Sequence, residues 1–188
     1  MPRLSSGLEL PGDIKGDLSS LEVPIPGASW IEEDNLHITL RFAGDIDNRL
    51  ANEFAEELSR IDLDVFELAI EGVHVLGGND PKILYAGLRQ SPQLEALARA
   101  HERAARSTGL QPEARAFKPH ITLARLRHVS IPDLTRFLQA QALYRSRAFL
   151  VEEFVLFSSK PKTGGGPYVV EETFPLRGST YVHSSLGD

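Results

Sequence analysis

The sequence His-Ile-Thr-Leu occurs twice in this chain of 188 residues, at positions 37–40 and again at 120–123. In an extended strand, successive side chains point to opposite faces. The His and Thr of each copy therefore share one face, and the Ile and Leu share the other. Each copy predicts a strand that packs an apolar face into a core and displays an imidazole beside a hydroxyl.

The chain has an ordinary globular composition, 41% hydrophobic and 24% charged, and it contains no cysteine. Disulfides, thiolate metal sites and cysteine nucleophiles are therefore excluded. Because no apolar run is long enough to cross a bilayer and residues 1–10 lack the apolar segment of a signal peptide, we expect a cytoplasmic protein. The formal net charge of −6 disfavours sequence-independent binding along a nucleic acid. An RNA substrate would be held at its end only, by a local basic patch.

Strand and helix patterns alternate along the chain, and each half has one His-Ile-Thr-Leu strand followed by a helix. The clearest helix start is Ser91-Pro92, because serine caps a helix well and proline suits its first position. Ser5 and Ser6 make the first strand a weak prediction. Strands are expected at 4–10, 36–42, 66–76, 82–88, 117–126, 147–157 and 168–174, helices at 13–21, 47–60, 91–108 and 131–140, and glycine-rich turns at 77–81 and 163–167.

Other stretches accompany the repeat in a definite order. They are Trp30, Asn-Leu-His-Ile-Thr-Leu-Arg-Phe-Ala-Gly at 35–44, Ile-Leu-Tyr-Ala-Gly-Leu at 83–88, Phe-Lys-Pro-His-Ile-Thr-Leu-Ala-Arg at 117–125, Phe-Val-Leu-Phe-Ser-Ser at 154–159 and Gly-Pro-Tyr at 166–168. Together they resemble the two-histidine (2H) phosphoesterase superfamily, and within it the LigT-like, or ThpR-type, RNA 2′,3′-cyclic phosphodiesterases. The chain departs from the family at Ser5 and Ser6, where an apolar pair is usual, and at the small Ala43.

The resemblance implies an α+β fold of two pseudo-symmetric lobes, each an antiparallel sheet backed by helices, with the active-site cleft between them. We expect one domain over residues 1–177, followed by a polar tail at 178–188. The resemblance further implies hydrolysis of an RNA-terminal 2′,3′-cyclic phosphate to a 2′-phosphate, without a metal or other cofactor. Reversible joining of RNA ends through a 2′-5′ linkage is also known in the family. The partner implied is an RNA 3′ end, tRNA fragments included, and we expect a monomer.

Hydrolysis of a cyclic phosphodiester needs a base for water, an acid for the departing ribose oxygen and donors for the phosphoryl oxygens. Histidine can serve as either the acid or the base near neutral pH. By resemblance, His37 is the acid that protonates O3′ and His120 is the base, although a pseudo-symmetric site could work either way round. Thr39 and Thr122 would donate hydrogen bonds to the phosphoryl oxygens.

Four further residues are candidates for substrate binding. The family has an arginine at the position of Arg125 that contacts phosphate and an aromatic residue at the position of Phe42 that packs on the base. Both lie five residues after a motif histidine, so in a regular strand they would face away from it, and they reach the site only if the strand bulges, twists or ends. Arg41 and Lys118 share the face of the histidines and could add positive charge, or could simply be solvated.

Three alternatives remain open. A metallohydrolase is disfavoured, because the motifs lack the third histidine or carboxylate that a hydrolytic metal requires. The same site could act on small cyclic phosphates such as ADP-ribose 1″,2″-cyclic phosphate, or on 2′-5′ oligonucleotides, because the motifs recognise only the phosphate. A non-catalytic module that binds RNA ends is the third alternative, and the intact His and Thr of both motifs argue against it.

Overall fold

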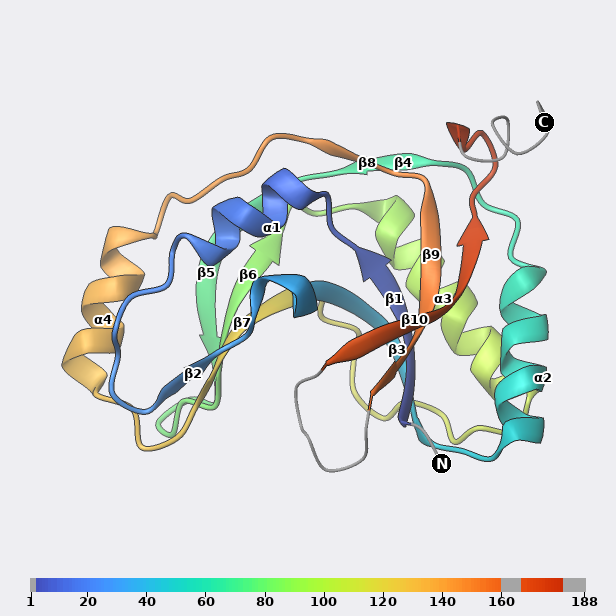
Figure 1. Ribbon diagram of the computed structural model, residues 1–188, viewed down its shortest axis with the longest axis horizontal. Coiled ribbons are helices and arrows are strands. Elements are labelled where there is room, and N and C mark those ends of the chain that lie inside the picture. Colours follow the sequence, from blue (N-terminus) through green and yellow to red (C-terminus); the bar gives the residue numbers. More distant parts are fainter. Residues whose placement is uncertain (1–2, 160–166, 181–188) are drawn as a thin grey trace.

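The computed structural model describes residues 3–159 and 167–180, and these residues form an α+β fold with two four-stranded antiparallel sheets (Figure 1). The first sheet has the order β10-β9-β1-β3, and the second has the order β2-β7-β6-β5. The strands are β1 (Arg3–Glu9), β2 (Ala28–Trp30), β3 (His37–Asp45), β4 (Phe66–Leu68), β5 (Ile70–Leu76), β6 (Ile83–Leu88), β7 (His120–Leu126), β8 (Phe149–Val151), β9 (Glu153–Ser159) and β10 (Tyr168–Pro175). The helices are α1 (Gly12–Ser19), α2 (Asn48–Ser59), α3 (Pro92–Ser107) and α4 (Ile131–Ala140), with a 3-10 turn at Glu33–Asn35.

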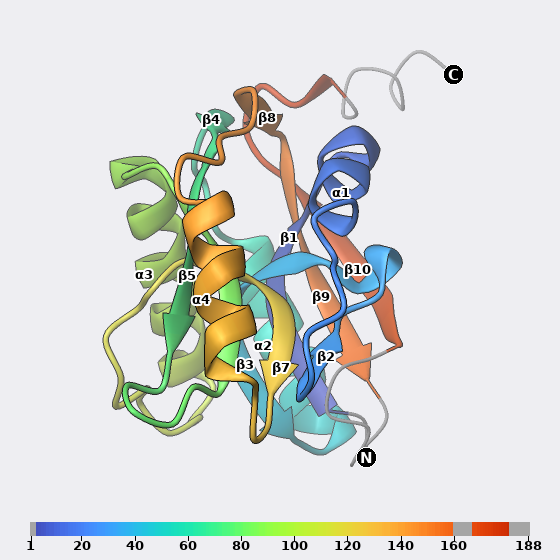
Figure 2. The ribbon, with the colours of Figure 1, turned by 90° about the vertical axis from the view of Figure 1, so that its left-hand side faces the viewer.

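The predicted two-lobed arrangement is confirmed, but the lobes are not the two halves of the chain. The first lobe takes its sheet from the beginning and the end of the described chain, and the second lobe takes most of its sheet from the middle. Helices α2 and α3 lie beside the first sheet, whereas α4 lies beside the second, at the opposite end of the molecule (Figures 1 and 2). The strands β3 and β7, which carry the two motifs, contact each other where the lobes meet.

Two predicted strands, 66–76 and 147–157, are each divided in the structure. The first breaks after Leu68 and the second after Val151, and the short pieces β4 and β8 pair with each other. Their continuations then enter different sheets, β5 the second and β9 the first. A strand that passes from one sheet to another needs a bend at the corner. The sequence patterns predicted the extended residues correctly but not these corners.

Other boundaries differ in smaller ways. Strand β2 was not predicted, because three residues are too few to show an alternating pattern; it pairs with β7, and its Trp30 packs edge-on against Phe137 of α4. The predicted helix caps are confirmed, since Asp47 accepts a hydrogen bond from the Leu50 amide and Ser91 accepts one from the Leu94 amide. Most of the predicted turn at 163–167 and of the tail at 178–188 lies outside the described residues. Among the helices of the described ranges, none has the length and apolarity to span a bilayer.

Both motif strands contain a β-bulge at the same place. On β3, Thr39 pairs with Gly7 and Arg41 pairs with Ser6, so Leu40 is an extra residue. On β7, Thr122 pairs with Tyr85 while the next pair joins Ala124 to Leu84, so Leu123 is the extra residue. An extra residue reverses the alternation of faces beyond it. Side chains that follow the bulge by two residues therefore return to the face of the histidine.

The unusual serines of β1 are accommodated by a polar pair in the core. Ser6 is fully buried, and its hydroxyl lies 2.6 Å from Nδ1 of His101, a fully buried residue of α3. The ring of His101 also packs edge-on against Phe154. Burial lowers the pKa of His101 to about 3, because a charged imidazole would lose its hydration there. The weak first strand thus becomes a central strand that is joined to a helix by a neutral hydrogen bond.

The buried Ser6–His101 pair predicts that the protein loses stability in mild acid. Unfolded His101 takes up a proton below its ordinary pKa of 6.5, whereas the folded protein resists protonation down to about 3. The free energy of unfolding is therefore unaffected above pH 6.5 and falls between pH 6.5 and 3, at up to about 1.4 kcal/mol per pH unit. We expect urea unfolding between about pH 7.5 and 5 to show this slope, and the Ser6→Ala/His101→Leu double variant to lose it. An equal slope in both proteins would contradict the assignment.

Candidate active site

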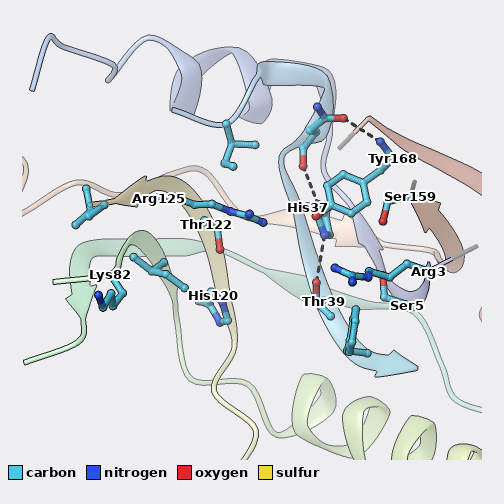
Figure 3. A pocket seen from close by; sticks show the side chains of 15 residues that line it. Arg3, Ser5, His37, Thr39, Lys82, His120, Thr122, Arg125, Ser159 and Tyr168 are labelled. Atoms are coloured by element: carbon cyan, nitrogen blue, oxygen red, sulfur yellow. Dashed lines mark hydrogen bonds between the residues drawn. The ribbon is translucent and has the colours of Figure 1, made fainter. Parts of the chain in front are cut away.

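A cleft of about 500 Å³ lies between the two lobes and is lined by both motif pairs, His37 with Thr39 and His120 with Thr122 (Figure 3). The apolar residues of the motifs, Ile38, Leu40, Ile121 and Leu123, are buried on the other side of their strands. The sequence pattern therefore separates a core face from a cleft face, as predicted. The two His/Thr pairs come from different lobes, so a ligand in this cleft would lie between two imidazoles.

Both imidazoles are fixed by the same local hydrogen bond. Nδ1 of His37 lies 2.7 Å from the carbonyl oxygen of Asn35, and Nδ1 of His120 lies 2.7 Å from that of Lys118. A carbonyl oxygen can only accept, so each Nδ1 carries the proton. The free nitrogen of each neutral ring is then Nε2. On His37, Nε2 lies 3.2 Å from the Thr39 hydroxyl. Each ring can accept or donate one proton through Nε2.

Aromatic side chains hold the two rings in different environments. His37 packs against both Phe157 and Tyr168, with ring centroids 4.9 and 4.4 Å away. His120 contacts only Tyr85, edge-on at 5.5 Å, among the ring contacts of the described residues. Burial lowers the pKa of His37; the Asn35 carbonyl opposes this effect, and the positive charge of a protonated His120 adds to it. A protonated His37 therefore releases its proton more readily than an imidazolium in water does.

The bulges bring into the cleft the two predicted residues that lie five positions after a motif histidine. Phe42 and Arg125 line it, and Phe42 is half exposed. Arg125 points from the second lobe toward the space in front of His37 (Figure 3). The aromatic ring of Phe42 from the first lobe and the guanidinium of Arg125 from the second lobe therefore flank the two histidines. The sequence analysis expected this arrangement only if both strands bulged, and both do.

Arg41 does not line the cleft, so the prediction that it charges the cleft is wrong; Lys118 is not among the lining residues either, and its contribution of charge stays a prediction. The bulge at Leu40 turns Arg41 away from the face of His37, and it is buried in an ion pair with Glu102 of α3. Lys118 precedes β7, and its ammonium lies 5.5 Å from the centroid of the Tyr85 ring. Strand parity failed for Arg41 because of the bulge, and it does not apply to Lys118, because the strand begins only at His120.

The cleft has a positive lining although the protein is negative overall. Arg3, Lys82 and Arg125 line it, and the described lining includes no aspartate or glutamate, although the Lys82 ammonium is paired with the exposed Asp80 at 2.7 Å. Sequence reasoning missed Arg3 and Lys82 as site residues because they lie outside the motifs, on β1 and just before β6. It also missed Asn35, whose carbonyl orients His37 and whose side-chain oxygen accepts a hydrogen bond from the Tyr168 amide. Within residues 3–159 and 167–180, no cluster of three or more His, Asp or Glu side chains could hold a metal ion.

Comparison with known proteins agrees with this fold. The family model described as LigT like Phosphoesterase matches residues 8–85 and 88–168, which is most of the chain. The chain belongs to the LigT-like phosphoesterase family. Its fold superimposes on Escherichia coli LigT complexed with 3′-AMP with a TM-score of 0.76 and 25% identity, over 94% of this chain and 99% of LigT. A protein of Thermus thermophilus matches with a TM-score of 0.77 and 24% identity, over 94% and 98% of the two chains.

Several relatives of this LigT-like protein are described as RNA 2′,3′-cyclic phosphodiesterases. The RNA 2′,3′-cyclic phosphodiesterase of Geobacillus stearothermophilus is 30% identical over 95% of this chain, and that of Aeropyrum pernix is 32% identical over 58% of it. The matched regions span 56% and 64% of the lengths of those two relatives. A third relative of the same description, from Aquifex aeolicus, is 29% identical over 79% of this chain and 82% of its own length.

We predict that substitution of Arg41 lowers stability, whereas substitution of Arg125 weakens phosphate binding. Arg41→Ala would leave Glu102 without its buried partner and lower the free energy of unfolding by about 1–3 kcal/mol, while binding of inorganic phosphate persists. Arg125→Ala would leave stability nearly unchanged and weaken phosphate binding. Urea unfolding and phosphate titration followed by NMR measure both quantities. Equal weakening of phosphate binding by the two variants would contradict the placement of Arg41.

The environment of His37 predicts how its ring titrates. In the free protein, its Cε1–H resonance should titrate below the ordinary pKa of 6.5. A bound nucleoside 2′-phosphate should raise that pKa, because its negative charge favours the imidazolium. NMR titration with and without adenosine 2′-phosphate tests both statements. A midpoint above 6.5 in the free protein, or one that the ligand does not move, would contradict this description of the ring.

Proposed function

We propose that this protein hydrolyses the 2′,3′-cyclic phosphate at the 3′ end of an RNA to a 2′-phosphate, without a metal. The observation that carries the proposal is the pair of Nε2 atoms, one from each lobe, presented to one cleft by identical Nδ1–carbonyl hydrogen bonds. The description shared by the relatives is a second support.

The proposed reaction moves one proton at each side of the phosphorus. Nε2 of neutral His120 takes a proton from water, and the resulting oxygen attacks phosphorus opposite to O3′. The P–O3′ bond breaks, and protonated His37 gives its Nε2 proton to O3′. This role suits the lowered pKa of His37, because a more acidic imidazolium is the better proton donor. The negative charge of the bound phosphate would keep His37 protonated until the bond breaks.

The phosphoryl oxygens would be bound by donors from both lobes. Thr39 and Thr122 lie on the cleft face beside the histidines, and Arg125 adds a guanidinium, which suits phosphate oxygens. Phe42 is exposed enough to stack on the terminal base. Because positive charge gathers in the cleft of an acidic protein, an RNA would be held at its end rather than along its length. We take the enzyme to be a cytoplasmic monomer, with tRNA fragments among its substrates.

Two other substrates use the same chemistry. Small cyclic phosphates would present the same reacting group. The 2′-5′ ligation of RNA would be the same ring opening with an RNA 5′-hydroxyl in place of water. Cleavage of a 2′-5′ oligonucleotide would be the reverse of that ligation, in which the 3′-hydroxyl attacks the linear phosphodiester and the 5′ oxygen leaves with a proton. A role confined to binding would leave the paired Nε2 atoms without a purpose. Turnover on each compound separates these cases.

The direct test uses an RNA oligonucleotide that ends in a 2′,3′-cyclic phosphate, incubated with the protein in excess EDTA. We expect conversion to the 2′-phosphate, and a loss of roughly 10²–10⁴-fold for His37→Ala and for His120→Ala, which is the usual contribution of a general acid or base. His128→Asn, at an exposed position after β7, is the matched control.

Each other outcome has a definite meaning. A 3′-phosphate product would retain the histidine pair and reverse the polarity of the reaction. Loss of turnover in EDTA that an added divalent metal restores would contradict the metal-free mechanism. Binding of the RNA without turnover would favour a binding role, and turnover of small cyclic phosphates alone would change the substrate.

A further inference from the structure

Three described residues at one end of the cleft have no role in the proposed reaction. Arg3, Ser5 and Ser159 line the cleft in the first lobe. Arg3 and Ser5 alternate on β1, and Ser159 of β9 pairs with Arg3. Figure 3 shows the three side chains together, on the far side of His37 and Thr39 from His120. They therefore form a distinct polar end of the cleft, which we call the first-lobe subsite.

Donors in the first-lobe subsite have no hydrogen-bond acceptor among the residues that the structure describes. The buried Nε of Arg3 has no hydrogen-bond partner among the described residues, and the Asp45 carboxylate oxygen, 3.8 Å away, is too distant for a hydrogen bond. The hydroxyls of Ser5 and Ser159 likewise have no hydrogen bond to another described residue. A guanidinium beside two hydroxyls is a donor set that suits a phosphate group.

The Arg3 side chain is also held in position. Its guanidinium carbon lies 5.9 Å from the centroid of the Phe42 ring, and its side chain is about one-third exposed. The Asp45 carboxylate is more exposed than Arg3, so water screens its attraction for the guanidinium. A phosphate that enters the cleft would find this cation already oriented and only weakly neutralised.

The proposed reaction determines which phosphate can reach this subsite. Protonation of O3′ by His37 places O3′, and with it the terminal ribose, on the side of the first lobe. The RNA chain continues from the 5′ carbon of that ribose, and its first anionic group is the phosphodiester there. The reacting phosphate, by contrast, lies between the two histidines, within reach of Arg125.

We propose that Arg3, with Ser5 and Ser159, binds the phosphate on the 5′ side of the terminal ribose. This inference rests on the proposed function and refines its substrate class. The enzyme then selects ends that carry a 5′ phosphate, whether an oligonucleotide or a 5′-phosphorylated nucleoside, over a bare nucleoside 2′,3′-cyclic phosphate. The subsite gives a protein with net charge −6 one further contact with RNA without a basic surface outside the cleft.

The test compares adenosine 2′,3′-cyclic phosphate with the same nucleoside carrying a 5′-methylphosphate, which mimics the phosphodiester of RNA. We expect kcat/KM of the wild type to be roughly tenfold higher for the second compound, as befits hydrogen bonds to a charged group. The ratio should fall toward one in Arg3→Gln and in the Ser5→Ala/Ser159→Ala variant, and Arg3→Lys should keep part of it. Arg49→Gln, which removes an exposed arginine of α2, is the matched charge control and should keep the full ratio.

Failure of the subsite can be told apart from failure of the proposed function. A ratio near one in the wild type, with both compounds hydrolysed, would overturn the subsite and leave the phosphodiesterase intact. Equal loss of the ratio in Arg49→Gln would overturn it in favour of general electrostatic attraction. A ratio that survives in Arg3→Gln would also overturn it. If neither compound nor a cyclic-phosphate RNA is hydrolysed, the proposed function falls, and this inference falls with it.

Discussion

Each motif histidine donates its Nδ1 proton to the carbonyl oxygen two residues earlier in its own chain segment, Asn35 for one and Lys118 for the other. This hydrogen bond decides the tautomer, and the tautomer decides that Nε2 is the nitrogen free to exchange a proton in the cleft. It needs no distant residue and recurs in both lobes. A ring without it could rotate and place either nitrogen toward the substrate. The chemistry that we propose depends on this constraint more than on any other contact.

The bulges at Leu40 and Leu123 build the rest of the site around the two rings. Each one returns a side chain to the cleft, Phe42 in the first lobe and Arg125 in the second. Both lobes thus use the same β-bulge, but the side chain that it directs into the cleft is aromatic in the first lobe and cationic in the second. The same bulge turns Arg41 into the protein, where it ties β3 to α3 through Glu102. The extra residue at Leu40 therefore serves both the cleft and the packing behind it.

Sequence reasoning predicted what is local and missed what depends on a distant partner. Alternation within each motif predicted the buried Ile and Leu and the cleft-facing His and Thr, and the caps at Asp47 and Ser91 predicted where α2 and α3 begin. The bulges belong to the pairing of two strands, so neither strand alone reveals them. Ser6 looked like a defect in β1 because its partner, His101, lies 95 residues away. Arg3 was missed as a cleft residue for a similar reason, because only the pairing of β1 with β3 and β9 places it there.

The central claim is that the two imidazoles divide the labour, with His37 as the acid and His120 as the base. The most direct measurement compares hydrolysis of a 2′,3′-cyclic phosphate with that of its analogue in which sulfur replaces O3′, in His37→Ala and in His120→Ala. A thiolate leaves without a proton, so a missing acid matters little for the sulfur compound. We predict that sulfur restores most of the activity of His37→Ala and little of the activity of His120→Ala. Restoration of His120→Ala instead, or of neither variant, would contradict this division.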